Sequence, residues 1–369
     1  MKILFVEPYE SSLFSFRKEL LDELIIQKHQ VILAIASTKK VQKEYSSKIK
    51  IINVHMNLKD KNIFSNLKLK QKYKKIIKSE KPDLIISYTI KPNIYCGFYS
   101  KKIPIIANIT GLGNMFKSNN MLSKLGILLY RKAFKNVNYV FFQNYDGLKF
   151  FEENKIRINN YKIIPGSGVN INRFKPLDLN SNDTINFLFA SRALKEKGFH
   201  LLIEAIPFVL KVNKNVHFNF LSFDKEMFAN IKLKELLEKY HNYITILDRT
   251  DDIAKVYSNN DFLISPSFYR EGISNVLLES LACGRPIITT KDNPGCKEVL
   301  QDGLNGFGIV SNDLNSLVEA IKKAASLPKS KIRELGINGR KFVIENFDRK
   351  FVVQYYLDVI DKIKELKKE

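Results

Sequence analysis

Short apolar runs alternate with longer amphipathic segments along the whole chain, and this alternation limits the fold more than any other feature. In the first half the strands predicted from these mainly apolar runs include residues 3–6, 31–36, 84–87 and 139–143. Segments with helical periodicity, such as residues 64–79, lie between them. Strands that are buried on both faces read as continuous apolar runs, with helices covering each face. The pattern therefore predicts an α/β chain whose sheets are doubly wound and mostly parallel.

The alternation stops once and then starts again, which predicts two domains. The turn-forming sequence PGSG occupies residues 165–168, and the stretch 173–182 that follows is polar. With 369 residues the chain is also long for one domain. We expect a first domain over 1–175, a second over 176–345 and a C-terminal helix over 346–369. Two Rossmann-like domains in series would face each other across a cleft, where ligands usually bind.

The composition argues against several classes of protein. No apolar run reaches 18 residues, so we expect no transmembrane helix, and the N-terminal MKILFVEPYE reads as a strand rather than a signal peptide. Cys96, Cys283 and Cys296 lack the spacing of a metal or redox site, which is typical of a reduced cytoplasmic protein. The five histidines are scattered, so no metal site is expected.

Positive charge is concentrated in the first half of the chain. The formal net charge is +22. Residues 1–175 contain 32 Lys and Arg but only 12 Asp and Glu, whereas residues 176–369 contain 28 and 26. This asymmetry predicts that the first domain faces a polyanion: an anionic membrane, a nucleic acid or a phosphorylated acceptor. A chain that is rich in lysine on all its solvated faces is the alternative interpretation.

Two predicted helices of the first half, 64–79 and 121–135, carry many of these basic residues. In the second, Leu122, Leu125 and Leu129 share an apolar stripe with basic residues around it. Each basic residue near an anionic lipid surface adds about 1 kcal/mol of binding free energy. Contact with a membrane surface is therefore one interpretation, and a solvated helix face is the other. The chain has no recognition-helix motif and no Gly/aromatic signature, which argues against nucleic acid.

The stretch from 261 to 296 combines a short strand, a loop, a helix and a second strand. Glu271 lies on the loop and Glu279 about one and a half turns into the helix, so both carboxylates can border one pocket. Ser274 is a good N-cap, and the free N–H groups of that helix end favour a phosphate. These features fit a nucleotide-linked ligand rich in hydroxyl groups. An ordinary α/β unit with two surface glutamates is the alternative.

Two further segments of the second half could contact such a ligand. The loop SRALKEKG places Arg192 and Lys197 after a predicted strand, where two cations could hold a diphosphate and stabilise a phosphate leaving group. A solvated turn is the alternative. Arg249 belongs to DRTDD at 248–252, which either borders a nucleotide base or caps the helix that begins near Ile253.

Two glycines of the first half follow a predicted strand. Gly111 and Gly113 belong to the segment ITGLGNMF, where backbone N–H groups could approach a ligand closely. Glycines after strands are often simple turns, which is the other interpretation.

Longer stretches of the chain carry a family resemblance. The sequence SPSFYREGISNVLLESLACGRPIITTKDNPGCKEVLQDGLNGF resembles the donor-site signature of the GT-B glycosyltransferases of family 4. SRALKEKG and PGSGVNINRFKP are similar to further segments of that family, and together these stretches cover most of 160–310. ITGLGNMF resembles a subgroup of bacterial enzymes that extend surface polysaccharides or lipid-linked oligosaccharides on undecaprenyl diphosphate. That subgroup includes enzymes that add N-acetylgalactosamine or related hexosamines.

The resemblance implies a GT-B fold and a role for each matching residue. Glu279 would bind the ribose hydroxyls of the donor nucleotide, and Glu271 the hydroxyls of the transferred sugar near the reacting carbon. Arg192 and Lys197 would bind the donor diphosphate. The donor-binding backbone would comprise Gly272, Ile273, Ser274 and Asn275. The residues that we assign to the acceptor side are Gly111, Gly113 and Arg17.

Family members retain the anomeric configuration and need no metal, and their C-terminal helix often crosses back to the first domain. The first half departs from the family at two places. Many members have Gly-Gly near the N-terminus, where this chain has Glu10, Ser11 and Ser12. Many also have His-Gly where this chain has Thr110 and Gly111.

These observations predict a retaining, metal-independent glycosyltransferase without a cofactor. It would move a hexose or N-acetylhexosamine from a nucleotide-diphosphate sugar, with UDP as the expected nucleotide, to an undecaprenyl-diphosphate-linked saccharide. It would work in the synthesis of bacterial lipopolysaccharide, capsule or a related glycan, as a peripheral protein on the cytoplasmic face of the membrane. The alternatives are a sugar-nucleotide epimerase of the same two-domain architecture and a polyanion-binding protein with a degenerate active site.

Overall fold

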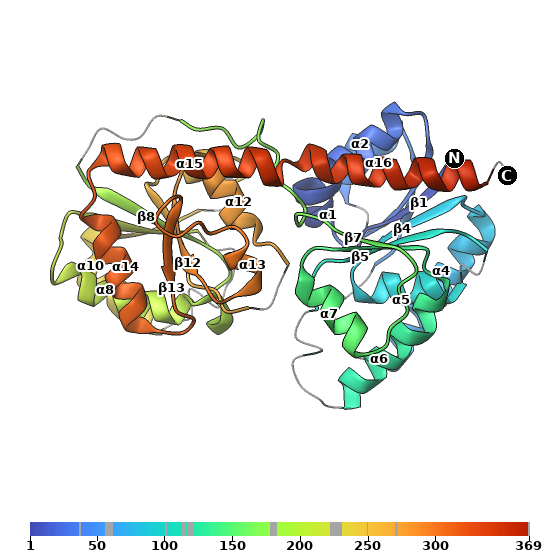
Figure 1. Cartoon of the computed structure of the whole chain (residues 1–369), viewed down its shortest axis with the longest axis horizontal. Helices are drawn as coiled ribbons and strands as arrows, with labels where there is room; N and C mark the ends of the chain where they lie inside the picture. Colours follow the sequence, from blue (N-terminus) through green and yellow to red (C-terminus); the bar gives the residue numbers. More distant parts are fainter. Residues whose placement is uncertain are drawn as a thin grey trace. The chain divides into compact units, whose positions relative to one another are not determined.

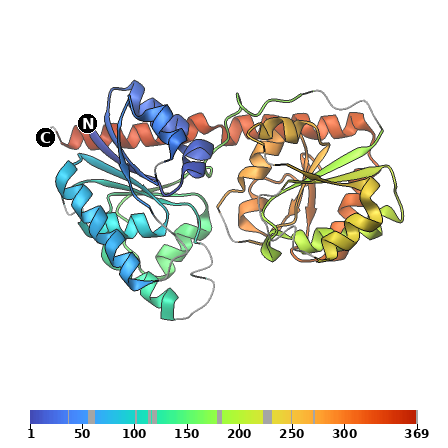
Figure 2. The same ribbon diagram turned by 180° about the vertical axis from the view of Figure 1, so that it is seen from behind.

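The chain forms two compact units in the computed structural model (Figures 1 and 2). The first consists of Met1–Ser167 together with Lys350–Glu369, and the second of Gly168–Arg349. The structure describes all residues except the following: 37, 56–61, 100–101, 113–115, 117–120, 178–182, 222–230, 249, 270–271 and 368–369.

The first unit is built around a sheet of seven strands in the order β3-β2-β1-β4-β5-β6-β7. All of these strands pair in parallel, and Leu4 of β1 lies between Ile32 of β2 and Ile85 of β4. The sheet confirms the strands expected from the apolar runs. They are β1 (Lys2–Val6), β2 (Gln30–Ile35), β3 (Lys50–Asn53), β4 (Leu84–Tyr88), β5 (Ile105–Ile109), β6 (Tyr139–Phe142) and β7 (Tyr161–Ile163).

Helices cover both faces of the first sheet, because successive side chains of a strand point to opposite faces. In β1, Ile3 and Phe5 join a buried cluster with α2, α3 and α16, whereas Leu4 and Val6 join a second cluster with α4 to α7. The helices are α1 (Glu10–Ser12), the π-helix η1 (Leu13–Arg17), α2 (Lys18–Ile26), α3 (Lys39–Tyr45), α4 (Ile63–Glu80), α5 (Ile90–Tyr99), α6 (Met121–Ala133), η3 (Phe134–Asn136), α7 (Tyr145–Glu153) and α16 (Arg349–Leu366).

The second unit repeats this plan with a sheet of six strands in the order β10-β9-β8-β11-β12-β13. All of its strands also pair in parallel. The doubly wound α/β architecture predicted for both halves is therefore confirmed. The strands are β8 (Ile185–Ala190), β9 (Val216–Leu221), β10 (Ile244–Leu247), β11 (Phe262–Ser265), β12 (Ile287–Thr290) and β13 (Gly306–Ile309).

Two buried clusters cover the faces of the second sheet. One contains Phe187 and Phe189 of β8 with residues of α8, α10 and α14, and the other contains Leu188 with residues of α12 and α15. A Cβ on Gly336 of α15 would lie 2.0 Å from the carbonyl oxygen of Gly284, so α15 packs directly on the end of α12. The helices are η4 (Lys195–Lys197), α8 (Phe199–Leu210), α10 (Ile231–Tyr240), η5 (His241–Tyr243), α11 (Ile253–Ser258), α12 (Asn275–Ala282), α13 (Pro294–Lys297), α14 (Leu314–Ala325) and α15 (Lys329–Phe347).

The segment 301–309 reads as a polar loop in the sequence, and the structure shows that this interpretation is wrong for its last residues. Gly306–Ile309 forms the edge strand β13, which pairs with β12. A Cβ on Gly306 would lie 2.0 Å from the carbonyl oxygen of Ile287. The glycine therefore allows β12 and β13 to approach each other closely. Because glycine is uncommon in strands, the sequence of this segment does not indicate a strand.

The C-terminal helix packs on the sheet of the first unit, where Val352, Tyr356 and Ile360 are buried. The chain passes between the units at 167/168 and at 349/350, compared with the predicted boundaries at 175/176 and 345/346. The two passages are hydrogen bonded to each other: the N–H of Val169 donates to the carbonyl oxygen of Phe347 at 2.8 Å.

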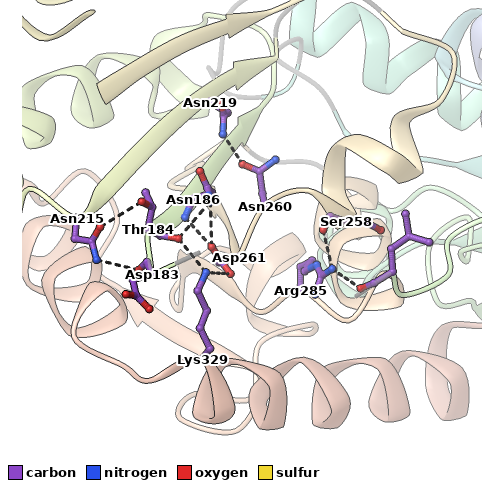
Figure 3. Close-up of polar contacts among 11 residues, drawn as sticks. Asp183, Thr184, Asn186, Asn215, Asn219, Ser258, Asn260, Asp261, Arg285 and Lys329 are labelled. Atoms are coloured by element: carbon purple, nitrogen blue, oxygen red, sulfur yellow. Dashed lines mark hydrogen bonds and ion pairs between the residues drawn. The ribbon is translucent and has the colours of Figure 1, made fainter. Parts of the chain in front are cut away.

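Polar side chains at the amino edge of the second sheet pair with one another (Figure 3). Lys329 Nζ lies 2.7 Å from Asp261 Oδ1 and donates to the carbonyl oxygen of Thr184 at 2.9 Å. Asp261 Oδ2 accepts from the backbone N–H of Asn186 at 2.8 Å. This network joins the starts of β8, β11 and α15.

Helix α6 differs from its predicted apolar stripe. Leu122 and Leu125 are 39% and 51% exposed, and the helix instead buries small residues such as Gly126 and Ala133. A Cβ on Gly97 of α5 would lie 2.8 Å from the carbonyl oxygen of Ala133, so these small residues allow α5 and α6 to pack closely. The leucines are consequently left on the outer side. None of the described helices is both long and apolar enough to cross a membrane.

Candidate functional site

The strand order of the second sheet reverses between β8 and β11. β9 and β10 lie on one side of β8, and β11 to β13 on the other. In open parallel sheets a ligand binds outside the carboxyl ends of the strands at such a point. The loop after β8, residues 191–198, and the described parts of the loop after β11, residues 266–269 and 272–274, border this position. The structure thus places the two predicted donor-binding segments side by side.

These two loops are held together by direct contacts. The N–H of Phe268 donates to the carbonyl oxygen of Glu196 at 2.9 Å. Gly198 has a φ of +75°, and a Cβ there would lie 2.3 Å from the carbonyl oxygen of Pro266. Only glycine therefore fits this position without displacing the neighbouring loop. The contacts give the edge a defined arrangement in which both loops can touch one ligand.

The predicted cations both lie on the first of these loops. Arg192 is exposed to solvent, and Lys197 is half-buried. Lys197 Nζ lies 5.2 Å from the centroid of the Tyr269 ring, a favourable cation–π arrangement that orients the lysine towards the loop after β11. Two positive charges thus stand at the carboxyl edge of the sheet, where an anionic group of a ligand would be stabilised.

The start of α12 follows directly. Gly272, Ile273 and Ser274 are buried, and Ser274 occupies the N-cap position as predicted. Its side chain makes no capping hydrogen bond, which differs from the role expected of an N-cap serine. Asn275 Oδ1 is buried and has no hydrogen-bond partner among the described residues. The N-terminal end of α12 therefore has fewer hydrogen bonds within the described residues than an N-cap serine predicts.

Glu279 lies on α12 and is partly buried. Tyr257 of α11 donates its hydroxyl to Glu279 Oε2 at 2.9 Å. Burial raises the pKa of Glu279 to about 7, although the Tyr257 hydrogen bond and the charges of Arg349 and Arg173 oppose this rise. Burial also raises the pKa of Tyr257 well above its usual value, so its hydroxyl stays protonated and remains a donor. The carboxyl group of Glu279 is consequently fixed in place by Tyr257, and it ionises near neutral pH.

Two residues that the sequence analysis did not single out support the loop after β11. Thr290 Oγ1 donates to the carbonyl oxygen of Ser267 at 2.7 Å. Asn293 Nδ2 donates to the same oxygen at 2.7 Å and to that of Tyr269 at 3.2 Å, while Asn293 Oδ1 is buried and unpaired among the described residues. Their position in the stretch that resembles a donor-site signature is the signal that could have identified them.

Three predicted site residues, Glu271, Arg249 and Gly113, lie outside the described residues. Next to Arg249, Asp252 Oδ1 accepts from the N–H of Lys255 at 3.3 Å and caps α11. The capping interpretation of the segment 248–252 is therefore confirmed for Asp252.

The first unit holds the remaining acceptor-side residues. Gly111 follows β5 and has a φ of +138°, a conformation that favours glycine. Arg17 ends the π-helix η1 and is 5% exposed. Its Nη1 donates to Ser167 Oγ at 3.0 Å, and its guanidinium carbon lies 4.3 Å from the centroid of the Tyr88 ring. Arg17 thus belongs to the buried carboxyl edge of the sheet rather than to the exposed basic surface.

Metal ions in proteins are usually bound by clusters of His, Cys, Asp and Glu side chains. Within the described part of the chain, no group of three or more His, Cys, Asp and Glu side chains is placed to hold a metal ion.

Comparison with known proteins adds a family to this geometry. Residues 184–326 match the family model described as glycosyl transferases group 1, and residues 2–144 match glycosyl transferase 4-like. The chain is 26% identical to the N,N'-diacetylbacillosaminyl-diphospho-undecaprenol alpha-1,3-N-acetylgalactosaminyltransferase of Campylobacter jejuni, over 98% of this chain and 99% of the relative. It is 24% identical to the capsular polysaccharide biosynthesis glycosyltransferase CapM of Staphylococcus aureus, over 89% of each chain.

A solved structure shows the same fold. The crystal structure of Anabaena HepE in complex with UDP and glucose superposes with a TM-score of 0.78, over 98% of this chain and 100% of that chain. Its sequence identity to this chain is 17%, so this likeness concerns the fold alone.

Proposed function

Since this chain belongs to the GT-B glycosyltransferases with a 4-like and a group 1 domain, we propose that it is a retaining, metal-independent hexosyltransferase. It moves a hexose or N-acetylhexosamine from a UDP-sugar to a saccharide linked to undecaprenyl diphosphate, in bacterial polysaccharide or glycan synthesis. The name of the Campylobacter relative, with its undecaprenol-linked acceptor, supports the acceptor class. The UDP and glucose bound by the structural neighbour support the donor class.

The observation that carries the proposal is the joining of the two loops at the carboxyl edge of the second sheet. The contact of Gly198 with Pro266 brings the loop of Arg192 and Lys197 against the loop that leads into α12. Cations, helix start and carboxyl group then border one position, which is what a nucleotide-diphosphate sugar requires. The second unit is accordingly the donor-binding unit in this proposal.

Each part of the donor has a matching group. Arg192 and Lys197 bind the diphosphate and stabilise the charge that develops on it as the bond to the sugar breaks. Glu279 accepts hydrogen bonds from the ribose hydroxyls, and Glu271 from the hydroxyls of the transferred sugar. The donor-binding set is completed by Gly272, Ile273, Ser274, Asn275 and Arg249.

The first unit is the acceptor-binding unit in this proposal, with Arg17, Gly111 and Gly113 on the acceptor side. The departing phosphate accepts the proton of the attacking hydroxyl, so the new bond forms on the face that the leaving group occupied. This front-face course retains the anomeric configuration and needs no protein nucleophile.

A mixed apolar and basic surface on α6 supports peripheral binding to the inner face of the cytoplasmic membrane. Met121, Leu125 and Leu128 are 88%, 51% and 60% exposed on this helix. Lys124 and Arg131 are exposed beside them and line a hollow of about 340 Å³ together with Leu128. Exposed apolar side chains among cations are typical of helices that lie in an anionic lipid interface.

The donor assignment is tested by thermal shift with a panel of nucleotide sugars, followed by transfer assays with lipid-linked saccharides. A bound donor raises the melting temperature by mass action. We expect a UDP-sugar to give the largest shift, transfer to persist in EDTA, and Arg192→Ala to abolish transfer while Arg333→Ala, on α15, retains it. Full transfer by Arg192→Ala would show that the site assignment is wrong.

The same donor incubation separates the alternative activities. An epimerase converts a UDP-sugar into its isomer without an acceptor, whereas a transferase leaves the sugar unchanged until an acceptor is added. If the protein is only a polyanion-binding protein, Glu279→Ala leaves both polyanion binding and biological activity intact.

Membrane binding is tested by sedimentation with vesicles at low and at physiological salt. We expect binding to vesicles with anionic lipid, weak binding to neutral vesicles, and a loss of binding in Leu128→Glu. Ile337→Glu is a matched control, because Ile337 is 62% exposed on a helix of the second unit. Equal binding to neutral and anionic vesicles at low salt would contradict the membrane proposal.

A further inference from the structure

The first sheet also reverses its strand order, between β1 and β4. β2 and β3 lie on one side of β1, and β4 to β7 on the other (Figure 1). The general rule for open parallel sheets places a ligand outside the carboxyl ends of these two strands. The border of this position is formed by residues 7–12 after β1 and by Thr89 after β4. We call this place the β1/β4 crevice.

Buried polar atoms that lack a hydrogen-bond partner among the described residues gather at the β1/β4 crevice. They include Nε of Arg17, Oγ1 of Thr89 and Oε2 of Glu10. Arg17 is 5% exposed, and its ring contact with Tyr88 brings η1 against the end of β4. Buried donors and acceptors are nearly always paired, so a buried guanidinium nitrogen without a partner among the described residues indicates room for a further partner, such as a ligand.

Thr89 has an unusual backbone conformation. Its φ is +71°, in the left-handed region that β-branched residues rarely adopt. Its hydroxyl is buried without a partner in the described part of the chain, so no internal hydrogen bond of that hydroxyl explains the conformation. Backbone strain of this kind clusters at functional sites, where the surrounding structure holds a side chain in place for a ligand.

Glu7 follows β1 at the floor of the same crevice and is 2% exposed. It accepts a hydrogen bond from the Ser12 hydroxyl, which ties the loop after β1 to the sheet. Burial raises the pKa of Glu7 to about 7, while the charge of Arg17 and the Ser12 hydrogen bond oppose the rise. The carboxyl group thus positions the loop that carries Glu10.

We propose that the β1/β4 crevice binds the acceptor sugar that bears the attacking hydroxyl group. Thr89 and Glu10 hydrogen bond to its hydroxyls, Arg17 Nε donates to a ring or acyl oxygen, and Glu7 is a positioning residue that holds the loop. This inference rests on the proposed function and names the part of the acceptor that this edge recognises.

Charge favours a sugar over the acceptor diphosphate at this place. Glu7 and Glu10 place two carboxyl groups beside the single guanidinium of Arg17. The nearby Lys18 is already paired with Asp22 and Glu44, at 3.0 Å and 2.6 Å. A diphosphate offers only acceptor oxygens and is a poor match for two carboxyl groups beside one guanidinium, whereas sugar hydroxyls can donate to the carboxyl oxygens and accept from the guanidinium. The diphosphate of the acceptor binds elsewhere.

The first experiment measures binding without requiring transfer. Hydrogen exchange is followed in the full chain with a short polyprenyl diphosphate that carries one N-acetylhexosamine, and with the same polyprenyl diphosphate without the sugar. We expect the sugar-bearing probe alone to protect the backbone of 7–17 and 88–93. Equal protection by the sugar-free probe would show that the crevice holds the diphosphate, and absence of protection would show that the sugar binds elsewhere.

The second experiment uses variants that remove one sugar contact each. Thr89→Ala and Glu10→Ala should raise the KM for the sugar-bearing acceptor about tenfold, because a hydrogen bond to a ligand contributes roughly that factor. UDP affinity and kcat should stay close to wild type. Thr89→Ser keeps the hydroxyl and should behave as wild type, and so should Glu80→Gln, whose carboxylate pairs with Lys50 at 2.7 Å at the opposite edge of the sheet.

The two experiments distinguish this inference from the proposed function. Protection of the crevice in a wild-type protein that transfers no sugar would refute the transferase proposal and leave the sugar site standing. Transfer by the wild type with unchanged acceptor KM in both variants would refute the sugar site and leave the transferase standing. Circular dichroism spectra and melting temperatures of the variants show whether any loss reflects unfolding.

Discussion

Replacing Glu279 by glutamine should make the protein more stable at pH 8 and weaken its binding of UDP. In the folded state the pKa of Glu279 is about 7, compared with about 4.5 for an ordinary glutamate. An acid whose pKa is raised on folding binds its proton more tightly in the folded state. Its ionisation therefore removes stability as the pH rises from about 4.5 to above 7. Glutamine cannot ionise and still offers an oxygen to the Tyr257 hydroxyl.

The magnitude follows from the shift. One unit of pKa corresponds to about 1.4 kcal/mol, and solvent screens part of the effect because Glu279 is only partly buried. We expect Glu279→Gln to raise the free energy of unfolding of the second unit by about 1–3 kcal/mol at pH 8. For a unit of this size that corresponds to a rise in melting temperature of about 3–10 °C. At pH 4.5 the wild type and the variant should melt at similar temperatures.

Binding should change in the opposite direction. Hydrogen bonds from ribose hydroxyls to a carboxylate contribute about 1.5–3 kcal/mol, so the Kd of UDP should rise about 10- to 100-fold in the variant at pH 8. In the wild type, UDP affinity should fall as the pH drops below 7, because the ligand favours the ionised carboxylate. The affinity of Glu279→Gln should lack this pH dependence.

Calorimetry and UDP titrations between pH 5 and pH 8.5 test both effects on the same samples. Glu319→Gln is the matched control, since Glu319 is exposed on α14 of the same unit. A variant that melts below the wild type at pH 8 and binds UDP with wild-type affinity would show that Glu279 is a structural residue.

Three further substitutions test the packing of the second unit. Gly306→Ala should lower the free energy of unfolding by about 1–3 kcal/mol in denaturant titrations, because its Cβ would lie 2.0 Å from a carbonyl oxygen of β12. Gly303→Ala is the control: its Cβ would meet no atom within 4 Å, so only the strain of its positive φ should lower the stability. Lys329→Met should cost about 3–5 kcal/mol by leaving the buried Asp261 carboxylate without a cation, and Asp261→Asn in the same chain should restore part of the loss. Gly198→Ala should separate the two donor loops and weaken UDP binding at least tenfold in thermal-shift titrations, with little change in the melting temperature of the first unit.

Buried parallel strands explain why so much of the fold could be predicted. Strands such as Leu84–Tyr88 and Phe262–Ser265 are buried throughout because helices cover both of their faces, so each appears as a mainly apolar run in the sequence. The helix α5 (Ile90–Tyr99) was not predicted, because it contains Pro92 and Gly97. Pro92 lies in the first turn, where its missing N–H has no partner in any case, and Gly97 is required by the close approach of α6.

The site was harder to predict from the sequence, because its side chains and loops are held in position by contacts between segments that are far apart in the chain. Arg192, Lys197 and Glu279 could be selected by residue type and by resemblance. The hydroxyl that holds Glu279 comes from Tyr257, which is 22 residues away, and the side chain that holds the loop after β11 comes from Asn293. Thr89 could not be found at all, since its importance depends on a backbone angle that its residue type does not favour.

The two edges of each sheet differ in how their polar groups are satisfied, and this difference is consistent with where ligands bind. At the amino edges, Asp83 accepts from the N–H of Lys2 at 2.8 Å in the first unit, and Asp261 is paired in the second (Figure 3). At the carboxyl edges, Nε of Arg17 and the Oδ1 atoms of Asn275 and Asn293 lack partners among the described residues. An unpaired buried group costs about 1–3 kcal/mol, so each edge that is incomplete without a ligand makes its unit less stable. A donor or acceptor that supplies the missing partners should therefore stabilise the unit that binds it. A substitution at the carboxyl edge of one unit should remove the stabilisation by its own ligand and leave the stabilisation of the other unit unchanged.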